Sequence, residues 1–446
     1  MMPKLRQVNN WGMYPVVQAR MHAFRTVSEL TDFVHKTPSF ITRGSGLSYG
    51  DASLAPVILS TLKFNKVLAF DRERGIIRCE SGVTLGELLK VVVPAGWFLP
   101  VVPGTKYITV GGAVAADVHG KNHHKDGSFT RYVSSLNVMV QSGKVVSCSR
   151  EENKEIFHST CGGMGLTGII LEAEISLKKV NTAYIVQKNI MAPNLRALTS
   201  LLKEHDSSTF SVAWVDCLAR GSKMGRGVLM LGEYAQVDDL DQKDREFPLK
   251  VHKKARLSVP VVMPSFLLNS FTVGVFNELF YQKYNLSAKE TAVHYDKFFF
   301  PLDFIGKWNK LYGKRGFLQY QFVIPFEQGD ENLAEILGQI TKSRLASFLS
   351  VLKLLGPGEH TLSFPMPGYT LALDFPVTDK LFSLLDELDK IVAACGGRIY
   401  LAKDSRMKLQ TFVDGYPQAV TFRKQVEDSN GVKFGSMLSE RLSIIK

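Results

Sequence analysis

Three glycine-rich segments in the first 170 residues have the composition of a ligand-binding site. The first, at residues 42–51, places three glycines within seven positions, directly after a strand-like stretch. Glycine lets the backbone adopt positive φ and turn successive N–H groups toward one point, a geometry that suits a pyrophosphate. The second segment, residues 109–116, has small residues that permit close approach of a large planar ligand, and the third spans residues 162–170. One such loop alone is an ordinary tight turn, but the three together predict a phosphorylated, planar ligand.

Residues 163–168 also match the dinucleotide fingerprint GxGxxG. That fingerprint requires a preceding strand and an acidic residue about 20 positions later. Here a helix start precedes the glycines, and no acidic residue ends a second strand. We therefore interpret this segment as a tight turn behind the ligand and not as a Rossmann loop.

Polar side chains later in the chain could bind hydroxyl groups and accept a proton. Gln319 and Gln321 alternate with Tyr320 on a predicted strand, so both amides point to one face, where they suit sugar hydroxyls. Lys403 lies in a polar turn between a strand and Asp404. A desolvated lysine can have its pKa lowered toward neutrality, and such an amine can receive a proton.

Other cationic residues have more than one interpretation. Lys121 and Lys353 can each bind a phosphate as a point charge, although a lysine taken singly is usually an exposed surface residue. His123 and His124 have no carboxylate or cysteine partner at ligand spacing. We interpret them as structural histidines and expect no metal site.

The elements that must position these residues begin with an α+β unit in the first third of the chain. Capping boxes at residues 26–29 and 84–87 open two predicted helices. Strands are predicted at residues 40–42, 57–60, 76–80, 137–141, 144–148 and 168–177. We place the end of this unit near residue 182.

The middle of the chain mixes strands with longer helices. Strands are predicted at residues 210–215, 227–231, 318–324 and 370–375, and helices at residues 332–343 and 379–394. The second helix has one apolar face and ends at two glycines, after which a strand is expected at residues 398–401. This pattern predicts a sheet-and-helix substrate domain.

Length, composition and charge restrict the class of protein. A chain of 446 residues with 45% hydrophobic and 22% charged residues is typical of a globular enzyme of two or three domains. Five cysteines without a CxxC pair, and a start without signal-peptide features, favour a reducing, cytoplasmic location. The net charge of +12 comes without any nucleic-acid-recognition pattern, so we expect no nucleic-acid partner. An anionic membrane surface, a phosphate-bearing substrate or a simply solvated basic surface would each account for it.

One segment could contact a membrane. Residues 250–256 are basic, and residues 259–280 are apolar but interrupted by prolines, which excludes a transmembrane helix. The segment is either buried core beside a solvated charge run or a flap that touches membrane or lipid. In the second case the protein would lie peripherally at the cytoplasmic face of the plasma membrane, with the periplasmic face as the alternative.

The three glycine segments resemble the flavin-binding domain of the vanillyl-alcohol-oxidase family of FAD-linked oxidases. Four further blocks are similar to the members of that family that oxidise a lipid-linked phosphoribose: residues 119–124, 317–325, 353–357 and 402–406. The resemblance implies an α+β, two-domain FAD-linked oxidase fold with a PCMH-type FAD-binding domain. The implied division is residues 1–182 for the FAD-binding domain, 183–397 for a mixed sheet-and-helix substrate domain, and 398–446 for a C-terminal segment that returns to the FAD domain.

The cofactor that this resemblance implies is non-covalently bound FAD. Covalent members carry a histidine where this chain has Leu47, and an aliphatic side chain cannot form a bond to the isoalloxazine ring. The expected contacts are Thr42, Arg43, Gly44, Ser45, Gly46, Leu47, Ser48, Tyr49, Gly50, Asp51, Ala52, Gly104, Thr109, Val110, Gly111, Gly112, Ala116, Asp117, Val118, His119, Ile170 and Tyr400.

Oxidation of an alcohol by a flavin removes a hydride from carbon while the hydroxyl proton leaves, so a protein group must receive that proton. The catalytic candidates are Lys403, then His119 and Lys121. The substrate candidates are Gln319, Gln321, Lys353, Trp214 and Thr370. Phe299, Thr370 and Ala372 differ from the residues of mycobacterial members, which leaves the exact sugar or lipid open.

The resemblance implies oxidation of the 2′-hydroxyl of a polyprenylphosphoryl-β-D-ribose to the 2′-keto sugar. A separate NAD(P)-dependent short-chain reductase would then complete the epimerisation to the arabinose lipid. Two alternatives stay open: a soluble sugar-alcohol or aldonolactone oxidase of the same fold, and a flavin- or phosphate-binding protein without turnover. The glutamine and lysine set argues against the last alternative, because binding FAD does not require it.

Overall fold

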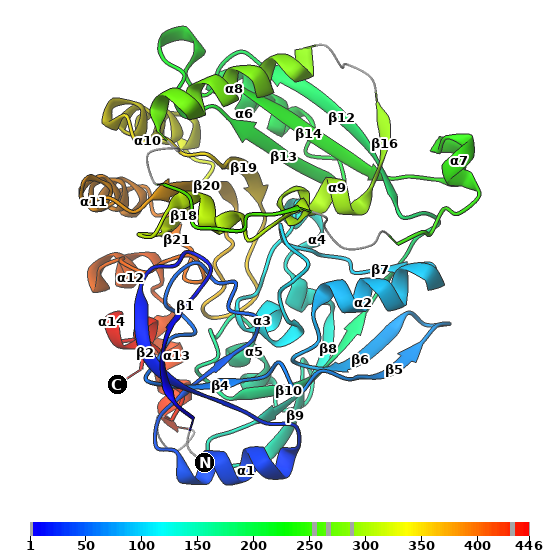
Figure 1. Cartoon of the computed structure of the whole chain (residues 1–446), viewed down its shortest axis with the longest axis vertical. Helices are drawn as coiled ribbons and strands as arrows, with labels where there is room; N and C mark the ends of the chain where they lie inside the picture. Colours follow the sequence, from blue (N-terminus) through cyan, green and yellow to red (C-terminus); the bar gives the residue numbers. More distant parts are fainter. Residues whose placement is uncertain (1–2, 252–256, 265–268, 286–289, 429–432, 446) are drawn as a thin grey trace.

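The computed structural model describes residues 3–251, 257–264, 269–285, 290–428 and 433–445. The chain forms an α+β fold, with two small sheets at one end of the molecule and one large sheet at the other (Figure 1). The predicted boundary near residue 182 falls between β11 (Lys178–Lys179), which pairs with β7 (Trp97–Phe98), and β12 (Tyr184–Ala192) of the large sheet.

The first small sheet has the strand order β1-β2-β4-β3. Its strands are β1 (Leu5–Asn9), β2 (Val16–Ala23), β3 (Ile41–Arg43) and β4 (Val57–Ser60). The Thr26 side chain caps the helix α1 (Val27–Lys36), which connects β2 to β3. β3 then leads directly into the first glycine segment, so this sheet fixes where that loop begins.

The second small sheet is antiparallel and has the order β5-β6-β10-β8-β9. Its strands are β5 (Val67–Asp71), β6 (Ile76–Glu80), β8 (Val133–Met139), β9 (Val145–Ser149) and β10 (Ile169–Ser176). The helices beside it are α2 (Leu85–Val92), α3 (Val110–Ala115), α4 (His123–Asp126) and α5 (Lys154–Thr160). The predicted capping box at Thr84 and Glu87 is confirmed, and α2 buries its apolar face from Leu85 to Val92.

The large sheet has eight strands in the order β16-β12-β14-β13-β19-β20-β18-β21, and every neighbouring pair is antiparallel. Besides β12 the strands are β13 (Phe210–Val215), β14 (Gly227–Tyr234), β16 (Thr291–His294), β18 (Phe317–Ile324), β19 (Ser350–Leu355), β20 (Gly368–Pro376) and β21 (Arg398–Ile399). The predicted strand at residues 210–215 has these same bounds. The sheet therefore joins segments that are more than two hundred residues apart in the sequence, from β12 to β21.

Three amphipathic helices pack their apolar residues against this sheet: α6 (Leu195–Glu204), α10 (Gly329–Ser343) and α11 (Asp379–Ala394). The prediction for residues 379–394 is confirmed. A fourth helix, α8 (Ser270–Asn285), contacts β12 and β14 and lies at the far end of the molecule from the small sheets (Figure 1). The remaining helices include α7 (Gln242–Arg245) and α9 (Tyr295–Phe299). None of the helices in the described ranges is long and apolar enough to cross a bilayer.

The C-terminal segment is shared between the two ends of the molecule. β21 forms the edge of the large sheet, and it is shorter than predicted because the Tyr400 carbonyl already accepts from the Lys403 N–H in the following turn. The helices α12 (Leu409–Gly415), α13 (Ala419–Asp428) and α14 (Met437–Arg441) follow. Phe434 then forms a bridge with Phe40 beside the first small sheet, which places the red end of the chain next to β1 and β2 (Figure 1). Residues 398–446 thus begin in the large sheet and end beside the first small sheet.

Candidate active site

A cavity of about 730 Å³ lies between the glycine segments and the large sheet. The side toward the small sheets is lined by residues 42–49, by Gly111 and Gly112, and by His119. The side toward the large sheet is lined by residues of β18, β19 and β20 and by the turn that carries Lys403. We call these two sides the glycine wall and the sheet wall.

The glycine wall depends on missing side chains. Gly46 has φ +67°, and a Cβ there would lie 2.0 Å from Nη2 of Arg43, whose guanidinium lies beneath the loop. A Cβ at Gly44 would lie 2.1 Å from Oγ1 of Thr109, so the first two glycine segments touch only because Gly44 has no side chain. Thr109 Oγ1 in turn accepts from the Gly112 N–H at 3.3 Å.

Arg43 lines the cavity, and its guanidinium is hydrogen-bonded to the end of β1 and the residue after it. Its Nη2 donates to the Asn9 carbonyl at 2.7 Å, and its Nη1 donates to the Asn10 side chain. Burial, together with the nearby Arg6, lowers the pKa of Arg43 to about 10. The arginine therefore supports the loop from behind.

The sheet wall carries polar residues in cross-strand register. Gln319 lies opposite Asp374, Gln321 lies opposite Ala372, and these positions share one face of β18 and β20. The Gln321 amide contacts His119 Nε2 at 3.0 Å and donates to Thr370 Oγ1 at 3.2 Å. Both glutamine amides therefore lie at the cavity, as the alternation in the sequence predicts.

Two lysines face the cavity from the sheet wall. The ammonium of Lys403 lies 3.9 Å from the ring centroid of Tyr49. Burial lowers the pKa of Lys403 to about 7, Asp374 opposes this change, and Lys353 adds to it. Burial also lowers the pKa of Lys353, to about 8. Lys403 is therefore able to take up and release a proton near neutral pH.

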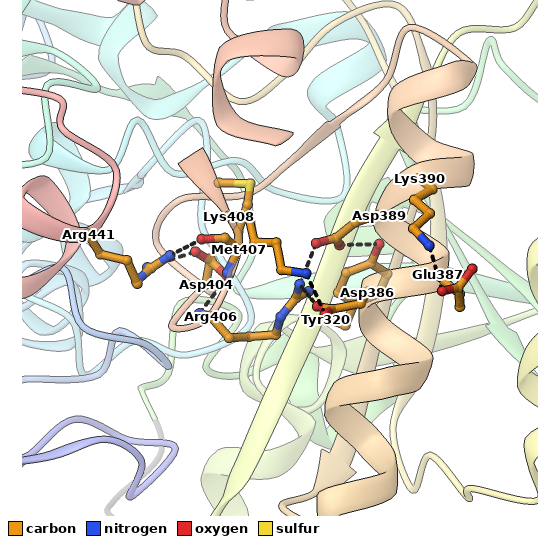
Figure 2. Close-up of polar contacts among 10 residues, drawn as sticks. All are labelled: Tyr320, Asp386, Glu387, Asp389, Lys390, Asp404, Arg406, Met407, Lys408 and Arg441. Carbon is orange, nitrogen blue, oxygen red and sulfur yellow. Dashed lines mark hydrogen bonds and ion pairs between the residues drawn. The ribbon is translucent and has the colours of Figure 1, made fainter. Parts of the chain in front are cut away.

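A network of ion pairs fixes the turn that carries Lys403 (Figure 2). Asp404 Oδ1 accepts from the N–H groups of Arg406 and Met407 at 3.0 and 2.9 Å, and its Oδ2 pairs with Arg441 at 2.8 Å. Arg406 pairs with Asp389 at 2.5 Å, and Asp389 also accepts from the Tyr320 hydroxyl at 3.1 Å. Arg441 in addition pairs with Asp51 at 3.0 Å, at the end of the first glycine segment. One guanidinium thus links the turn of the sheet wall to the loop of the glycine wall.

Most of the predicted site residues line this one cavity. They are Thr42, Arg43, Gly44, Ser45, Gly46, Leu47, Ser48, Tyr49, Ala52, Gly104, Thr109, Gly111, Gly112, Ala116, Val118, His119, Ile170, Gln319, Gln321, Lys353, Tyr400 and Lys403. Their individual roles stay predictions, but the structure brings them together from both ends of the molecule.

Four residues predicted to contact FAD do not line the cavity. Gly50 allows contact between the loop and the Lys403 turn, since a Cβ there would lie 1.6 Å from the Asp404 carbonyl oxygen. Asp51 pairs with Arg441, and Val110 is fully buried in the apolar core. Asp117 is buried and accepts from the hydroxyls of Thr130 and Ser363. These four residues support the glycine wall from behind.

Three residues predicted to act on substrate also lie away from the cavity. The ammonium of Lys121 donates to the Phe298 carbonyl and lies 4.3 Å from the Phe298 ring centroid. The Trp214 ring packs 4.8 Å from the Phe280 ring of α8. Thr370 is fully buried and donates to the Phe322 carbonyl at 2.8 Å. Of these, Thr370 contacts the site indirectly, through Gln321.

Sequence reasoning missed several residues of the site. Asp374 is fully buried beside Gln319, and its signal is an acidic residue within an otherwise apolar strand. Asp303 lines the cavity and accepts from the Lys106 N–H at 3.0 Å, and burial raises its pKa to about 6. Trp11 and Trp308 also line it, with ring centroids 5.6 Å apart. No local pattern predicts these two tryptophans, which meet across almost three hundred residues.

The residues of the glycine wall fit a flavin nucleotide. The wall offers backbone without Cβ atoms at Gly44, Gly46, Gly111 and Gly112. Among the described residues, Ser81 Oγ and His119 Nδ1 are buried without a hydrogen-bond partner, and both residues line the cavity. A ligand that provides hydrogen-bonding atoms would satisfy them.

The described residues contain no group of three or more histidine, cysteine or acidic side chains placed to hold a metal ion. His123 instead contacts Ser128 Oγ at 3.1 Å and accepts from the Gly356 N–H at 3.0 Å. His124 contacts the Ser208 carbonyl at 3.0 Å.

Comparison with known proteins agrees with this architecture. A family model for an FAD binding domain matches residues 24–149. Among curated relatives, a D-lactate dehydrogenase of Anaerostipes hadrus is 31% identical over 30% of this chain and 29% of its own length. The human Δ24-sterol reductase is 30% identical over 25% of this chain and 22% of its own length. The cavity, the fold and this domain define an FAD-dependent oxidoreductase.

One relative matches almost the whole chain. The decaprenylphosphoryl-β-D-ribose oxidase of Mycolicibacterium smegmatis is 37% identical over 91% of this chain and 89% of its own length. An uncharacterised protein of Streptomyces coelicolor is 32% identical over 81% of this chain and 100% of its own length. The chain therefore belongs to the family of the decaprenylphosphoryl-β-D-ribose oxidases.

Proposed function

We propose that this protein oxidises the 2′-hydroxyl of a polyprenylphosphoryl-β-D-ribose to the 2′-keto sugar. The observation that carries this proposal is the sheet wall, where Lys403, Lys353 and two glutamines face the glycine wall across one cavity. The relative from M. smegmatis, named for oxidation of such a lipid-linked ribose, supports the same substrate class.

The glycine wall binds the cofactor, and the sheet wall binds the substrate and accepts its proton. The glycine wall holds FAD non-covalently, since Leu47 offers no atom for a bond to the flavin. Bound FAD supplies the hydride acceptor for the hydrogen on the carbinol carbon. Lys403 takes the hydroxyl proton as a neutral amine, Gln319 and Gln321 bind sugar hydroxyls, and Lys353 binds the phosphate as a point charge.

The closing experiment mixes the FAD-loaded protein anaerobically with a short-chain polyprenylphosphoryl-ribose and follows flavin absorbance. Bleaching with the lipid-linked ribose, and not with free sugar alcohols or aldonolactones, is the expected result. Bleaching by the free sugars alone would instead identify the soluble oxidase of the same fold. No bleaching with either class would favour a flavin-binding protein without turnover.

Contact with a lipid surface is the second part of the proposal. Large apolar side chains are exposed on and before α8, namely Leu257, Val261, Phe271 and Leu279, which are 61–77% exposed. β15 (Leu257–Ser258) pairs with β17 (Ile305–Gly306), and both residues of β17 line the cavity. A prenyl chain that leaves the cavity along β17 would meet this apolar surface.

We therefore propose that the protein binds peripherally at the cytoplasmic face of the plasma membrane. Of the predicted basic residues, Lys250 lies on the described surface, whereas Lys253, Lys254 and Arg256 lie outside the described residues. Each basic residue near an anionic surface adds about 1 kcal/mol, and salt screens this attraction.

Cosedimentation with anionic and neutral vesicles tests the membrane contact. We expect binding to anionic vesicles. This binding should weaken with salt and in the double variant Phe271→Ser/Leu279→Ser. The matched control is Val420→Ser, since Val420 is 71% exposed on α13 beside the small sheets. Equal loss with the control, or no binding at low salt, would contradict membrane contact. Spheroplast protection assays would separate the cytoplasmic from the periplasmic face.

The keto product implies a partner enzyme. Reduction of a ketone from the opposite face requires a separate hydride donor, for which we propose an NAD(P)-dependent short-chain reductase. Coupled incubation with such a reductase should convert the ribose lipid into its arabinose epimer, whereas incubation of either enzyme alone should not.

A further inference from the structure

Asp374 is a carboxyl group buried directly behind the sheet wall. It is fully buried on β20, opposite Gln319 of β18, whose amide donates to Oδ1 at 2.6 Å. Its backbone N–H is held by the Leu349 carbonyl at 3.1 Å and by Ser347 Oγ at 3.0 Å. Its Oδ2 is buried without a hydrogen-bond partner among the described residues. A buried carboxylate with a free oxygen is costly unless a charge or a proton balances it.

The titratable groups that face Asp374 come from three separate elements. Lys403 faces it from the turn after β21, Tyr49 from the first glycine segment, and Tyr312 from the short helix at residues 308–312. Burial raises the pKa of both tyrosines well above their usual value, so both stay neutral near pH 7. Lys403 is therefore the group that can balance the carboxylate.

Asp374 and Lys403 change each other's protonation. Burial raises the pKa of Asp374 to about 7, and Lys403 opposes this rise. Asp374 in turn opposes the lowering of the lysine pKa by burial. Two groups coupled in this way titrate as a pair and not as independent sites.

We propose that Asp374 is a positioning residue that carries the countercharge for Lys403 when the lysine takes the hydroxyl proton of the substrate. This inference rests on the proposed function. With the lysine neutral and the carboxylate ionised, the pair has a charge of −1. When the hydroxyl proton moves to the amine and the hydride leaves the same carbinol, the pair becomes neutral. A proton transfer that ends on a neutral buried pair is favoured over one that ends on a lone buried ammonium beside Lys353.

The test is the pH profile of anaerobic flavin reduction in Asp374→Asn, which keeps the hydrogen bond from Gln319. Loss of the negative charge lowers the pKa of Lys403. We therefore expect the acid limb to move to lower pH by about 1 unit or more, and the maximal rate to fall about tenfold. A lower rate with an unmoved acid limb would reduce Asp374 to a structural role. A shift in Asp303→Asn and none in Asp374→Asn would overturn the assignment as well.

A second measurement needs no substrate and so separates this inference from the proposed function. Infrared difference spectra of the FAD-loaded protein across a pH titration report the carbonyl stretch of a protonated buried carboxyl, which Asp374→Asn should remove. In Lys403→Met this band should persist to higher pH, because the neighbouring cation that favours the carboxylate is gone. An unmoved band would overturn the coupling, even if the lipid-linked ribose proves to be the substrate.

Discussion

The two walls of the cavity are built by opposite means. The glycine wall is shaped by side chains that are absent, so that loops approach one another and a ligand can lie against backbone. The sheet wall is shaped by charged side chains that are buried, and burial shifts the pKa values of Lys353, Lys403 and Asp374. Added atoms should therefore harm the first wall by weakening cofactor binding. Removed charges should harm the second wall and leave the cofactor in place.

The largest expected effect is on the sheet wall. Lys403→Ala should retain FAD but lose flavin reduction by about 10²-fold or more, because no amine remains to take the hydroxyl proton. Rapid mixing with the lipid-linked ribose measures this rate. Lys408→Ala is the matched control five positions further on, at the N-terminus of α12, since its side chain is 69% exposed and pairs with Asp386. Flavin reduction by Lys403→Ala at the parent rate would show that the lysine is not the proton acceptor.

Arg441→Gln should impair both walls together, because this arginine pairs with a residue on each side of the cavity. The change leaves Asp51 and Asp404 buried without their cation. We expect a loss of about 2 kcal/mol in unfolding free energy, less than the roughly 3–5 kcal/mol of a fully buried pair, because the arginine side chain is 24% exposed. FAD affinity and flavin reduction should both fall. Denaturant unfolding and flavin titration measure the two effects. Arg423→Gln on α13 is a control, since among the described residues that guanidinium binds the carbonyl oxygens of residues 443 and 444 and forms no ion pair. Equal losses in both variants would mean that the ion pairs add nothing specific.

A smaller effect is expected on the glycine wall. Gly46→Val should weaken FAD binding about tenfold, because valine is strained by about 1–2 kcal/mol in the left-handed region and its Cβ would displace Arg43. Gly104 lines the same cavity, and a Cβ added there would meet open space. The FAD affinity of Gly104→Ala should therefore stay close to that of the parent. Equilibrium dialysis of the flavin compares the two variants. Equal FAD affinities of the two variants would show that the glycine wall tolerates added side chains.

The last prediction concerns how the flavin is attached to the glycine wall. Because Leu47 cannot be linked to a flavin, acid or heat should release all of the pigment from the polypeptide. Ultrafiltration after denaturation, followed by absorbance of the filtrate, measures the release. Flavin that stays with the denatured chain would place a covalent bond at some other residue.

The glycine wall could be predicted because its information is local. Glycines within a few positions signal positive φ, which the structure has at Gly46, Gly162 and Gly165. Capping boxes likewise set the start of α2 within four residues.

The sheet wall could be predicted only in part, because its chemistry arises between strands. Alternation placed Gln319 and Gln321 on one face, but not the partner Asp374, which lies 55 positions away. Lys121 was expected at the cavity because it follows the residues of the glycine wall. The ammonium instead turns to the Phe298 carbonyl, a partner that only the folded chain provides. Contacts between residues far apart in the sequence determine where such side chains lie, and residue spacing does not predict these contacts.

The return of the last described residues to the first sheet has a consequence for synthesis on the ribosome. Phe40 pairs with Phe434, the Met437 N–H donates to the Leu54 carbonyl, and Arg441 neutralises Asp51. The loop that lines the cavity and the arginine that supports it are 390 positions apart in the sequence. During synthesis the loop emerges long before these three partners, and surface that waits for a distant partner is prone to misassembly. The loop is therefore fully supported only after residues 434–441 have been made.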